Sequence, residues 1–384
     1  MKRWLRRIGL FVVLVALFMA RPVYVHARAA ALLLRFSGGD AKPTGFARFG
    51  MHDVSEENAN VDTPQGTRRA RFYIPAGISD PPGIVVCHGV HHLGIEEPRM
   101  QKFARAIASS GVMVLTPELS ELADYHIDPH TIQTIGHAAM MLATRVKRTG
   151  VGVLGLSFAG GLSMMAATEP EFAPSIDFVI SVGGHDDLDR VARFFVTDEI
   201  EGPAGEKTHL KAHDYGAVVL VYMYVDSFFT PRDVPHAREA IRLWLWEQFD
   251  DARAAAARMS PEGQDKIALV FGHREDVLRP EIEKVIAAHE VDIRRVSPHG
   301  ALEGFRARAF LLHGEGDTVI PASETRWLAH DVPEGALASA VVSRAIVHVD
   351  MEGTPSFSDR YDLVHLMAGV IEAAEHEAPS GEPN

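Results

Sequence analysis

One short stretch, Val151–Gly161, constrains the fold of this chain more than any other. It reads Val-Gly-Val-Leu-Gly-Leu-Ser-Phe-Ala-Gly-Gly, an apolar run followed by Ser157 and then by a helix-like sequence. This order predicts a strand that turns sharply into a helix, with the serine hydroxyl on the strained turn. Small residues at Gly155 and Ala159 let the strand and the helix approach each other. We predict that Ser157 is a nucleophile and that the N–H of Phe158, at the helix N-terminus, binds an oxyanion. The alternative is a glycine-rich turn without chemistry.

Strand-like and helix-like segments alternate on both sides of this stretch. Buried strands are predicted at 83–89, 111–117, 151–154 and 178–184, and again at 307–312 and 338–343. Helices are predicted at 99–109, 131–147, 323–329 and 361–375. Continuous apolar strands that alternate with helices are typical of a mostly parallel, doubly wound α/β sheet.

The alternation stops between residues 187 and 304, where helix-like segments follow one another. We interpret 187–304 as a helical lid inserted into the domain near the serine, because such insertions usually join the loops that form a site. The alternative is a separate domain. The whole domain is predicted to span 61–375, and 376–384 is predicted to be a disordered tail. Four lid aromatics are candidates for an apolar acyl pocket: Phe228, Phe229, Trp244 and Trp246.

The N-terminus has the pattern of a targeting segment. Basic side chains between Lys2 and Arg7 precede an uncharged, mostly apolar run at 8–20. A run of this length fits the core of a signal peptide better than a bilayer span of about 20 residues. Residues 1–27 are therefore predicted to be a signal peptide cleaved before Arg28 or an uncleaved membrane anchor, followed by a linker or collar at 28–60. Either alternative exports the domain, which would be membrane-anchored, periplasmic or secreted.

Charge and cysteine content limit the classes of function. A net charge of −13 argues against a nucleic-acid partner, because phosphate binding depends on a basic surface. The single cysteine, Cys87, excludes an internal disulfide. His88, His91 and His92 could suggest a metal site, but no His-Glu-x-x-His pattern accompanies them. We predict neither a metal nor a cofactor.

A serine nucleophile needs a carboxylate that orients its base. Asp317 follows a buried strand in the turn Gly-Glu-Gly-Asp, which suits a buried acceptor for an imidazole. The alternatives for Asp317 are a turn-forming residue or a helix N-cap. Asp186 and Asp187, after the strand that ends at Gly184, are a reserve position for the acid.

The base is predicted to be His348, which follows the last strand. The order serine, acid, histidine along the chain matches the order that this type of triad uses. The nearest competitor is His365. It lies inside the closing helix, from which a side chain reaches the edge of the sheet less easily. His313 precedes the acid turn and is interpreted as a histidine that supports the core or the site.

The sequence His88-Gly89 after the first buried strand predicts the second oxyanion donor, for which we select the backbone N–H of Val90. Glu96-Glu97-Pro98-Arg99 follows as a loop and a helix start. Arg99 is a candidate contact for an anionic substrate.

As a set, these motifs resemble the α/β-hydrolase fold, and within it the dienelactone-hydrolase-like and esterase-like members. The resemblance covers 61–375 apart from the lid. It implies a serine hydrolase that cleaves carboxylic esters through an acyl-enzyme, with a small-molecule substrate that carries an apolar acyl part. The implied triad is Ser157, Asp317 and His348. Dienelactone hydrolases have cysteine where this sequence has Ser157, so their substrate does not transfer.

Three other functions stay open. Thioester or peptide hydrolysis would use the same fold and triad. A non-catalytic binding protein, anchored at a membrane, would keep the turn for structure only. A metal-dependent hydrolase is the third alternative.

Overall fold

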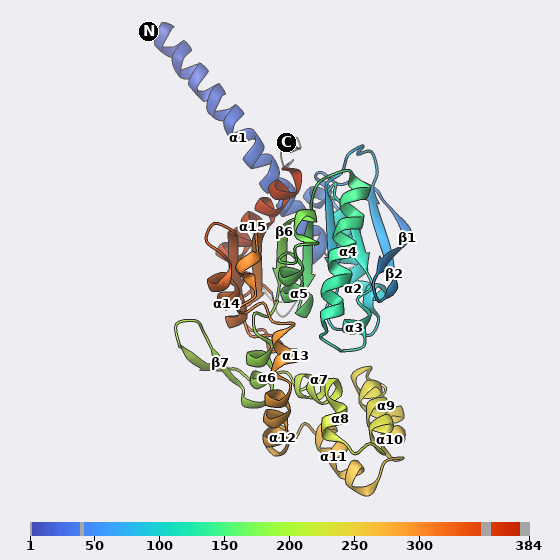
Figure 1. Ribbon diagram of the computed structural model, residues 1–384. Helices are drawn as coiled ribbons and strands as arrows, with labels where there is room; N and C mark the ends of the chain where they lie inside the picture. The colour runs from blue at the N-terminus through green and yellow to red at the C-terminus, as the bar shows by residue number, and fades with distance from the viewer. Residues whose placement is uncertain (1, 39–41, 347–354, 377–384) are drawn as a thin grey trace.

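An eight-stranded sheet forms the centre of the molecule (Figure 1). The computed structural model describes residues 2–38, 42–346 and 355–376, with side chains from residue 18 onward. The strands, in their order across the sheet, are β1 (Val54–Thr63), β2 (Gly66–Pro75), β4 (Met113–Pro117), β3 (Gly83–Cys87), β5 (Val151–Leu156), β6 (Ile176–Val182), β9 (Arg308–Gly314) and β10 (Leu337–Ser343). The strands from β4 to β10 run parallel, whereas β2 pairs antiparallel with both β1 and β4. The predicted mostly parallel α/β sheet is confirmed.

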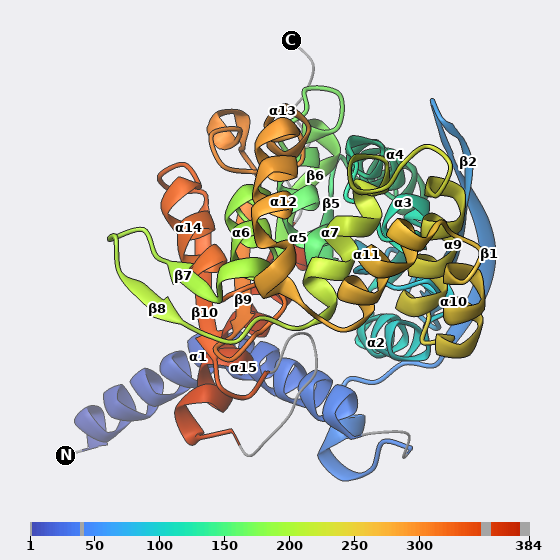
Figure 2. The same ribbon diagram turned by 90° about the horizontal axis from the view of Figure 1, so that it is seen from below.

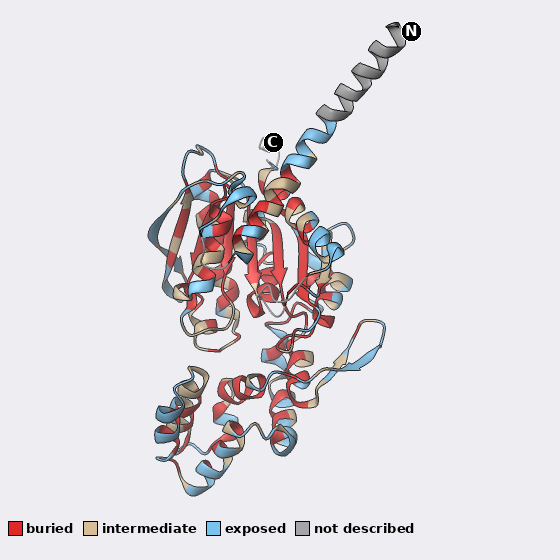
Figure 3. Ribbon diagram, turned by 180° about the vertical axis from the view of Figure 1, so that it is seen from behind, coloured by how far each residue is buried: buried red, intermediate tan, exposed pale blue. Residues whose placement is uncertain are grey.

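Helices cover both faces of this sheet (Figures 1 and 3). One face is covered by α4 (Pro129–Val146), α5 (Phe158–Ala166) and α14 (Ser323–Asp331), and the other by α2 (Pro98–Ala108), α15 (Phe357–Glu375) and the second half of α1 (Lys2–Ser37). Strand side chains alternate between the two faces. Val85, Val153 and Val179 join the core on the α4 side, and Val86, Leu154 and Ile180 join the core on the α2 side.

Capping residues fix where several helices begin. The Asp128 carboxylate accepts the His130 N–H at the start of α4, and Pro129 occupies the first turn, where its missing N–H costs nothing. Ser356 and Asp359 form a reciprocal capping box at the start of α15. Short α3 (Ser120–Ala123) precedes α4 on the chain.

Between β6 and β9 the chain forms a helical lobe beyond the carboxyl ends of the strands (Figures 1 and 2). Its elements are α6 (Leu188–Thr197), β7 (Glu199–Glu201), β8 (Lys207–His209), α7 (Tyr215–Met223), α8 (Val225–Phe228), α9 (Val234–Leu245), α10 (Phe249–Ala256), α11 (Pro261–Phe271), α12 (Glu275–Ala288) and α13 (Glu290–Arg294). The β7–β8 hairpin was not expected from the sequence, because its strands are short and mostly exposed. The helix-like stretch at 235–259 of the lobe forms two helices, α9 and α10, because Glu247 adopts φ 61° between them.

The N-terminal helix α1 continues without a break through the predicted cleavage point. Its first half projects away from the body, and its second half lies beside α15 (Figure 1). Val25 and Ala29 are buried against α15, and Arg28 pairs with Glu375. Residues on both sides of the predicted cleavage point therefore contact the domain. No helix within the described part of the chain has the length and apolarity to cross a membrane. The side chains of residues 1–17, which carry most of the apolar run, lie outside that part.

The predicted collar at 28–60 and the predicted domain start at 61 differ from the structure. Residues 28–37 belong to α1, and β1 already begins at Val54. Side chains 55–58 of this edge strand are exposed, so the strand lacks the apolar alternation that identifies strands in a sequence. Pairing with β2 over its whole length holds it in the sheet. Residues 377–384 of the predicted tail lie outside the described residues.

Candidate active site

Ser157 occupies the turn between β5 and α5 with φ 54° and ψ −132°, a backbone region that L residues rarely adopt. Its N–H donates to the Val182 carbonyl at 2.8 Å, which ties the turn to the end of β6. A Cβ on Gly155 would lie 2.2 Å from the Ala159 carbonyl oxygen, so only glycine lets β5 and α5 meet here. Ser157 is 3% exposed. The local sequence thus holds the serine in a strained, enclosed position.

The loop after β3 lies directly against the serine. A Cβ on Gly89 would lie 3.0 Å from the Ser157 Cβ. The imidazole of His88 fixes this loop: Nδ1 donates to the Gly89 carbonyl at 2.7 Å, and Nε2 accepts the Leu119 N–H at 3.0 Å. Burial lowers the pKa of His88, which favours the neutral ring that this pair of bonds requires. Val90 lines the same cavity as Ser157, and Phe158 opens α5.

An apolar cavity of about 170 Å³ begins at Ser157 and lies on the α2 side of the sheet. Its lining comes from β5, β6 and β9, from α2 and α15, and from α1. His91, Glu97 and Arg99 also line it, and Arg99 donates to the Glu97 carboxylate at 2.8 Å.

The lid aromatics have other neighbours. Phe228 and Phe229 are buried in the core, Trp244 stacks on Phe271 at 4.1 Å, and Trp246 faces His92 at 5.3 Å. The structure thus offers the cavity below Ser157 in place of the acyl pocket predicted in the lid.

Asp317 lies in the loop after β9, at the same sheet edge as Ser157, because β5, β6 and β9 are adjacent and parallel. It is fully buried. Its Oδ1 accepts the N–H groups of Val319 and Ile320 at 2.8 and 3.1 Å, and its Oδ2 lies 3.5 Å from Nε2 of His313. Burial, and then the charge of Asp317, raise the pKa of Tyr215 on α7. Asp317 therefore lies between the carboxyl edge of the sheet and the helical lobe.

The predicted base, His348, lies outside the described residues. The chain leads toward it from β10, the neighbour of β9, and Ile346 lines the cavity at Ser157. The two competitors have other partners. His365 lies on α15 with Nδ1 3.2 Å from Nε2 of His26 on α1. His313 is buried, with Nδ1 2.7 Å from the Thr325 hydroxyl and Nε2 2.8 Å from the Ile320 carbonyl.

The comparisons with known proteins are structural. No family model and no curated protein matches the sequence. A presumed hydrolase from Legionella pneumophila superposes with a TM-score of 0.54 at 16% identity, over 87% of this chain and 95% of that one. The chain has the α/β-hydrolase fold.

Two further solved structures are more distant. Brefeldin A esterase, a bacterial homologue of human hormone-sensitive lipase, gives a TM-score of 0.45 at 14% identity over 92% of this chain and 83% of its own. Pyrococcus horikoshii acylaminoacyl peptidase gives 0.46 at 14% identity over 87% of this chain. The chain spans 43% of the length of that peptidase.

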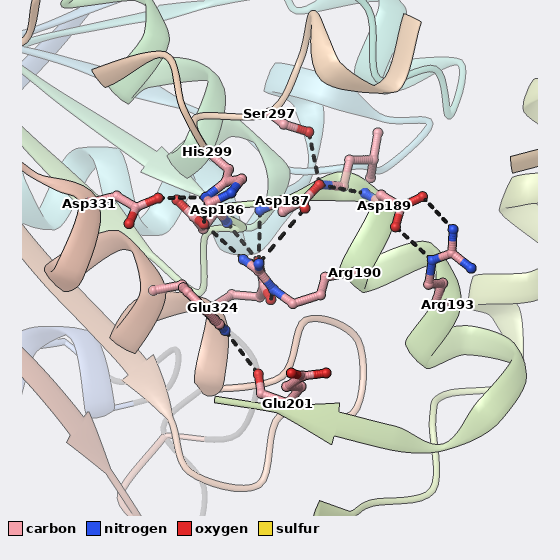
Figure 4. A network of polar contacts seen from close by, with 12 residues as sticks. Asp186, Asp187, Asp189, Arg190, Arg193, Glu201, Ser297, His299, Glu324 and Asp331 are labelled. Atoms are coloured by element: carbon pink, nitrogen blue, oxygen red, sulfur yellow. Dashed lines mark hydrogen bonds and ion pairs between the residues drawn. The ribbon is translucent and has the colours of Figure 1, made fainter. Parts of the chain in front are cut away.

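The reserve acid of this α/β-hydrolase domain belongs to a buried ion cluster (Figure 4). Arg190 on α6 donates to Asp186 Oδ2 at 2.8 Å and to Glu324 Oε1 at 2.7 Å, and its guanidinium lies 4.4 Å from the centre of the Trp327 ring. Glu324 Oε2 accepts the N–H groups of Asp186 and Asp187 at 2.9 Å. Burial, and then Glu324, raise the pKa of Asp186 to about 7. These contacts join α6, the first helix of the lobe, to α14. The Asp186 carboxylate is thus held in an ion pair within the protein.

Within the described part of the chain, His88, His91 and His92 belong to no group with the spacing of metal ligands. The rings of His91 and His92 stack on each other at 4.8 Å. Among the described residues, one group has the spacing of metal ligands: Asp186, His299 and Asp331. Arg190 already bonds to that Asp186, and His299 Nδ1 lies 2.6 Å from Asp331 Oδ2. A cation bound by these three residues would lie close to the positively charged guanidinium of Arg190, which disfavours its binding.

Sequence reasoning missed the contribution of α1 to the site. Leu33 and Phe36 line the cavity, although they fall in the stretch predicted to be a collar. The run Leu32-Leu33-Leu34-Arg35-Phe36 is apolar enough to signal a packed helix. The partner of that helix, α15, is more than 300 residues away in the sequence, so the contact itself had no local signal.

Proposed function

We propose that this chain is a serine hydrolase that cleaves carboxylic esters through an acyl-enzyme. One observation carries the proposal: Ser157 holds a strained backbone conformation at the head of an apolar cavity, with the Gly89 loop packed against it. Strain of this kind persists only where the surroundings enforce it, and it clusters at functional sites.

The proposed roles follow from these positions. Ser157 attacks the acyl carbon, and His348 takes its proton and later gives it to the leaving alcohol. Asp317 accepts from the imidazole and stabilises the imidazolium. The N–H groups of Val90 and Phe158 bind the oxyanion, and each such donor is worth about 3–4 kcal/mol in the transition state.

The cavity favours an ester over a peptide. Apart from Arg99 at the start of α2, its walls along the sheet, α2, α15 and α1 are apolar. A peptide chain placed there would bury amide groups without partners, which costs about 1–3 kcal/mol for each group. A hydrocarbon chain carries no such penalty.

A fluorophosphonate probe tests the proposal, because it reacts only with an activated serine. We expect the purified full chain to be labelled on Ser157, as mapped by mass spectrometry of the digested protein. Labelling is expected to disappear in Ser157→Ala and to fall strongly in His348→Ala.

Ser163→Ala is the matched control. Ser163 lies on the same helix, buried, with its hydroxyl bonded to the Ala159 carbonyl. It should label like the wild type. Absence of labelling in the folded wild-type chain would contradict the triad and favour the non-catalytic binding protein.

We also propose that the domain is exported by its N-terminal segment. The support is the basic flank before the apolar run at 8–20. Val13→Asp, which places a charge inside that run, is expected to keep the protein in the cytoplasm of an expressing bacterium, as measured by cell fractionation. The intact mass of the exported wild type separates a chain cleaved before Arg28 from a retained anchor. If the wild type and Val13→Asp were exported to the same extent, the proposal would be refuted.

A further inference from the structure

The cavity at Ser157 extends from the serine back along the strands of the sheet. Its floor consists of Leu156, Val182 and Leu312 near the serine, and of Leu154 and Ile180 one step further back. Residues i and i+2 of a strand point to the same face, so the two rows continue one apolar track along the sheet. Leu154 lies three residues before Ser157, a distance of about 10 Å along the strand. The track therefore leads away from the lid and down the face that carries α2.

Apart from Ser157, the polar groups that line the cavity come from the loop after β3 and the start of α2. His88 and His91 come from that loop, and Glu97 and Arg99 from the helix start. The remaining walls are aliphatic or aromatic. A cavity of this kind accepts a group that has a carbonyl at Ser157 and only hydrocarbon behind it.

The apolar lining suits the acyl half of an ester. The acyl group stays on Ser157 after the first step, whereas the leaving alcohol must reach solvent. The cavity volume is about 170 Å³. An engineered apolar cavity of about 150 Å³ accommodates benzene, so this cavity holds about six to eight carbons.

The N-terminal helix forms part of the outer wall. Leu33 and Phe36 of α1 line the cavity and are half-buried, and the Phe36 ring meets Phe103 of α2 edge-on at 4.9 Å. The helix is held there by its contacts with α15 and by Arg28, which donates to the Ser110 carbonyl at 2.8 Å. Its position is thus fixed relative to the sheet.

We propose, on the basis of the function proposed above, that the substrate class is esters of straight-chain acids of about six to eight carbons. The acyl chain lies between the sheet and α1, and Leu33 and Phe36 limit the space available to it. The N-terminal helix is in this way a specificity element of the site.

Hydrolysis of p-nitrophenyl esters from acetate to palmitate by the full chain tests this proposal. For the wild type we expect kcat/KM to rise about fourfold for each added methylene up to hexanoate or octanoate, and to fall for longer chains. Leu33→Trp fills the cavity. It is expected to lower kcat/KM for the octanoate ester about tenfold or more and to lower that for the acetate ester much less.

Leu34→Trp is the matched control, because Leu34 is the next residue of α1 and is 48% exposed. It should keep the wild-type profile. Phe36→Ala, which removes part of the wall, is expected to move the optimum to longer chains, and it tests the proposal if Leu33→Trp does not fold. Identical profiles for Leu33→Trp and Leu34→Trp, or a wild-type optimum at acetate, would overturn it.

Calorimetric binding of octanoate to Ser157→Ala separates this inference from the proposed function. If no ester is hydrolysed but octanoate binds and Leu33→Trp abolishes the binding, the cavity is assigned correctly and the catalytic function is wrong. If all esters were hydrolysed at one rate and octanoate did not bind, the proposed ester hydrolysis would stand. The assignment of the cavity as an acyl-binding site would then be wrong.

Discussion

Replacing Asp317 by asparagine is expected to lower kcat for ester hydrolysis about 10⁴-fold, the loss that follows when a triad carboxylate becomes an amide. The physical reason is that an amide neither holds the imidazole in the required tautomer nor stabilises the imidazolium. The fold should survive. Asparagine retains an oxygen for the N–H groups of Val319 and Ile320, which Asp317 Oδ1 accepts at 2.8 and 3.1 Å. Steady-state kinetics and thermal unfolding of the same preparation measure the two effects.

Asp186→Asn is the matched control, because Asp186 holds the reserve position for the acid. Its carboxylate is engaged with Arg190, so kcat should change little. The reverse result, a large loss in Asp186→Asn and a small one in Asp317→Asn, would move the acid of the triad to the loop after β6.

Replacing Arg190 by methionine is expected to lower the free energy of unfolding by about 3–5 kcal/mol, the usual cost of leaving buried charges without their partner. The side chains of Asp186 and Glu324 are 0% and 1% exposed, and the guanidinium lies between them (Figure 4). Without it, the buried carboxylate of Asp186, in the loop before α6, faces that of Glu324 on α14 with no positive charge between them. Urea unfolding at pH 8 measures the loss.

Arg193→Met on the same helix is the control. Arg193 pairs with Asp189 at 2.6 Å, but the two side chains are 50% and 30% exposed. Solvent-exposed ion pairs of this kind contribute about 0–1 kcal/mol. A loss in Arg190→Met no larger than that in Arg193→Met would contradict the role of the cluster.

The pH dependence adds a second check. The pKa of Asp186 is about 7 in the folded chain, above its ordinary value of 3.8, so between these values the folded state binds more protons than the unfolded state. The contribution of Asp186 to stability is therefore fully present below pH 4 and declines as pH rises toward 7. For the same reason, the destabilisation in Arg190→Met is expected to be smaller at pH 5 than at pH 8.

Several parts of the molecule were determined by local sequence. The run Val151–Gly161 predicted a strand, a tight turn and a helix, and the structure has all three. Gly155 has room only for a hydrogen beside the Ala159 carbonyl, and Ser157 occupies the turn. Apolar runs at the buried strands fixed the parallel sheet, and capping residues such as Asp128 fixed helix starts. The expected position of Asp317 followed from a buried strand with a glycine-rich turn. These features depend on a few neighbouring residues, so the sequence carries them directly.

Other parts were decided by contacts between distant segments. The edge strand β1 has exposed polar side chains and exists because β2 pairs with it. Asp186 follows a buried strand much as Asp317 does, but Arg190 and Glu324 turn it into a structural residue. The cavity at Ser157 needs α1 and α15 together, although these helices lie at opposite ends of the chain. The sequence by itself determined the fold and the strained turn at Ser157, because both depend on short-range sterics and apolar patterning. Tertiary structure decided the shape of the cavity and the ion-pair contacts of Asp186, because packing between remote segments sets both.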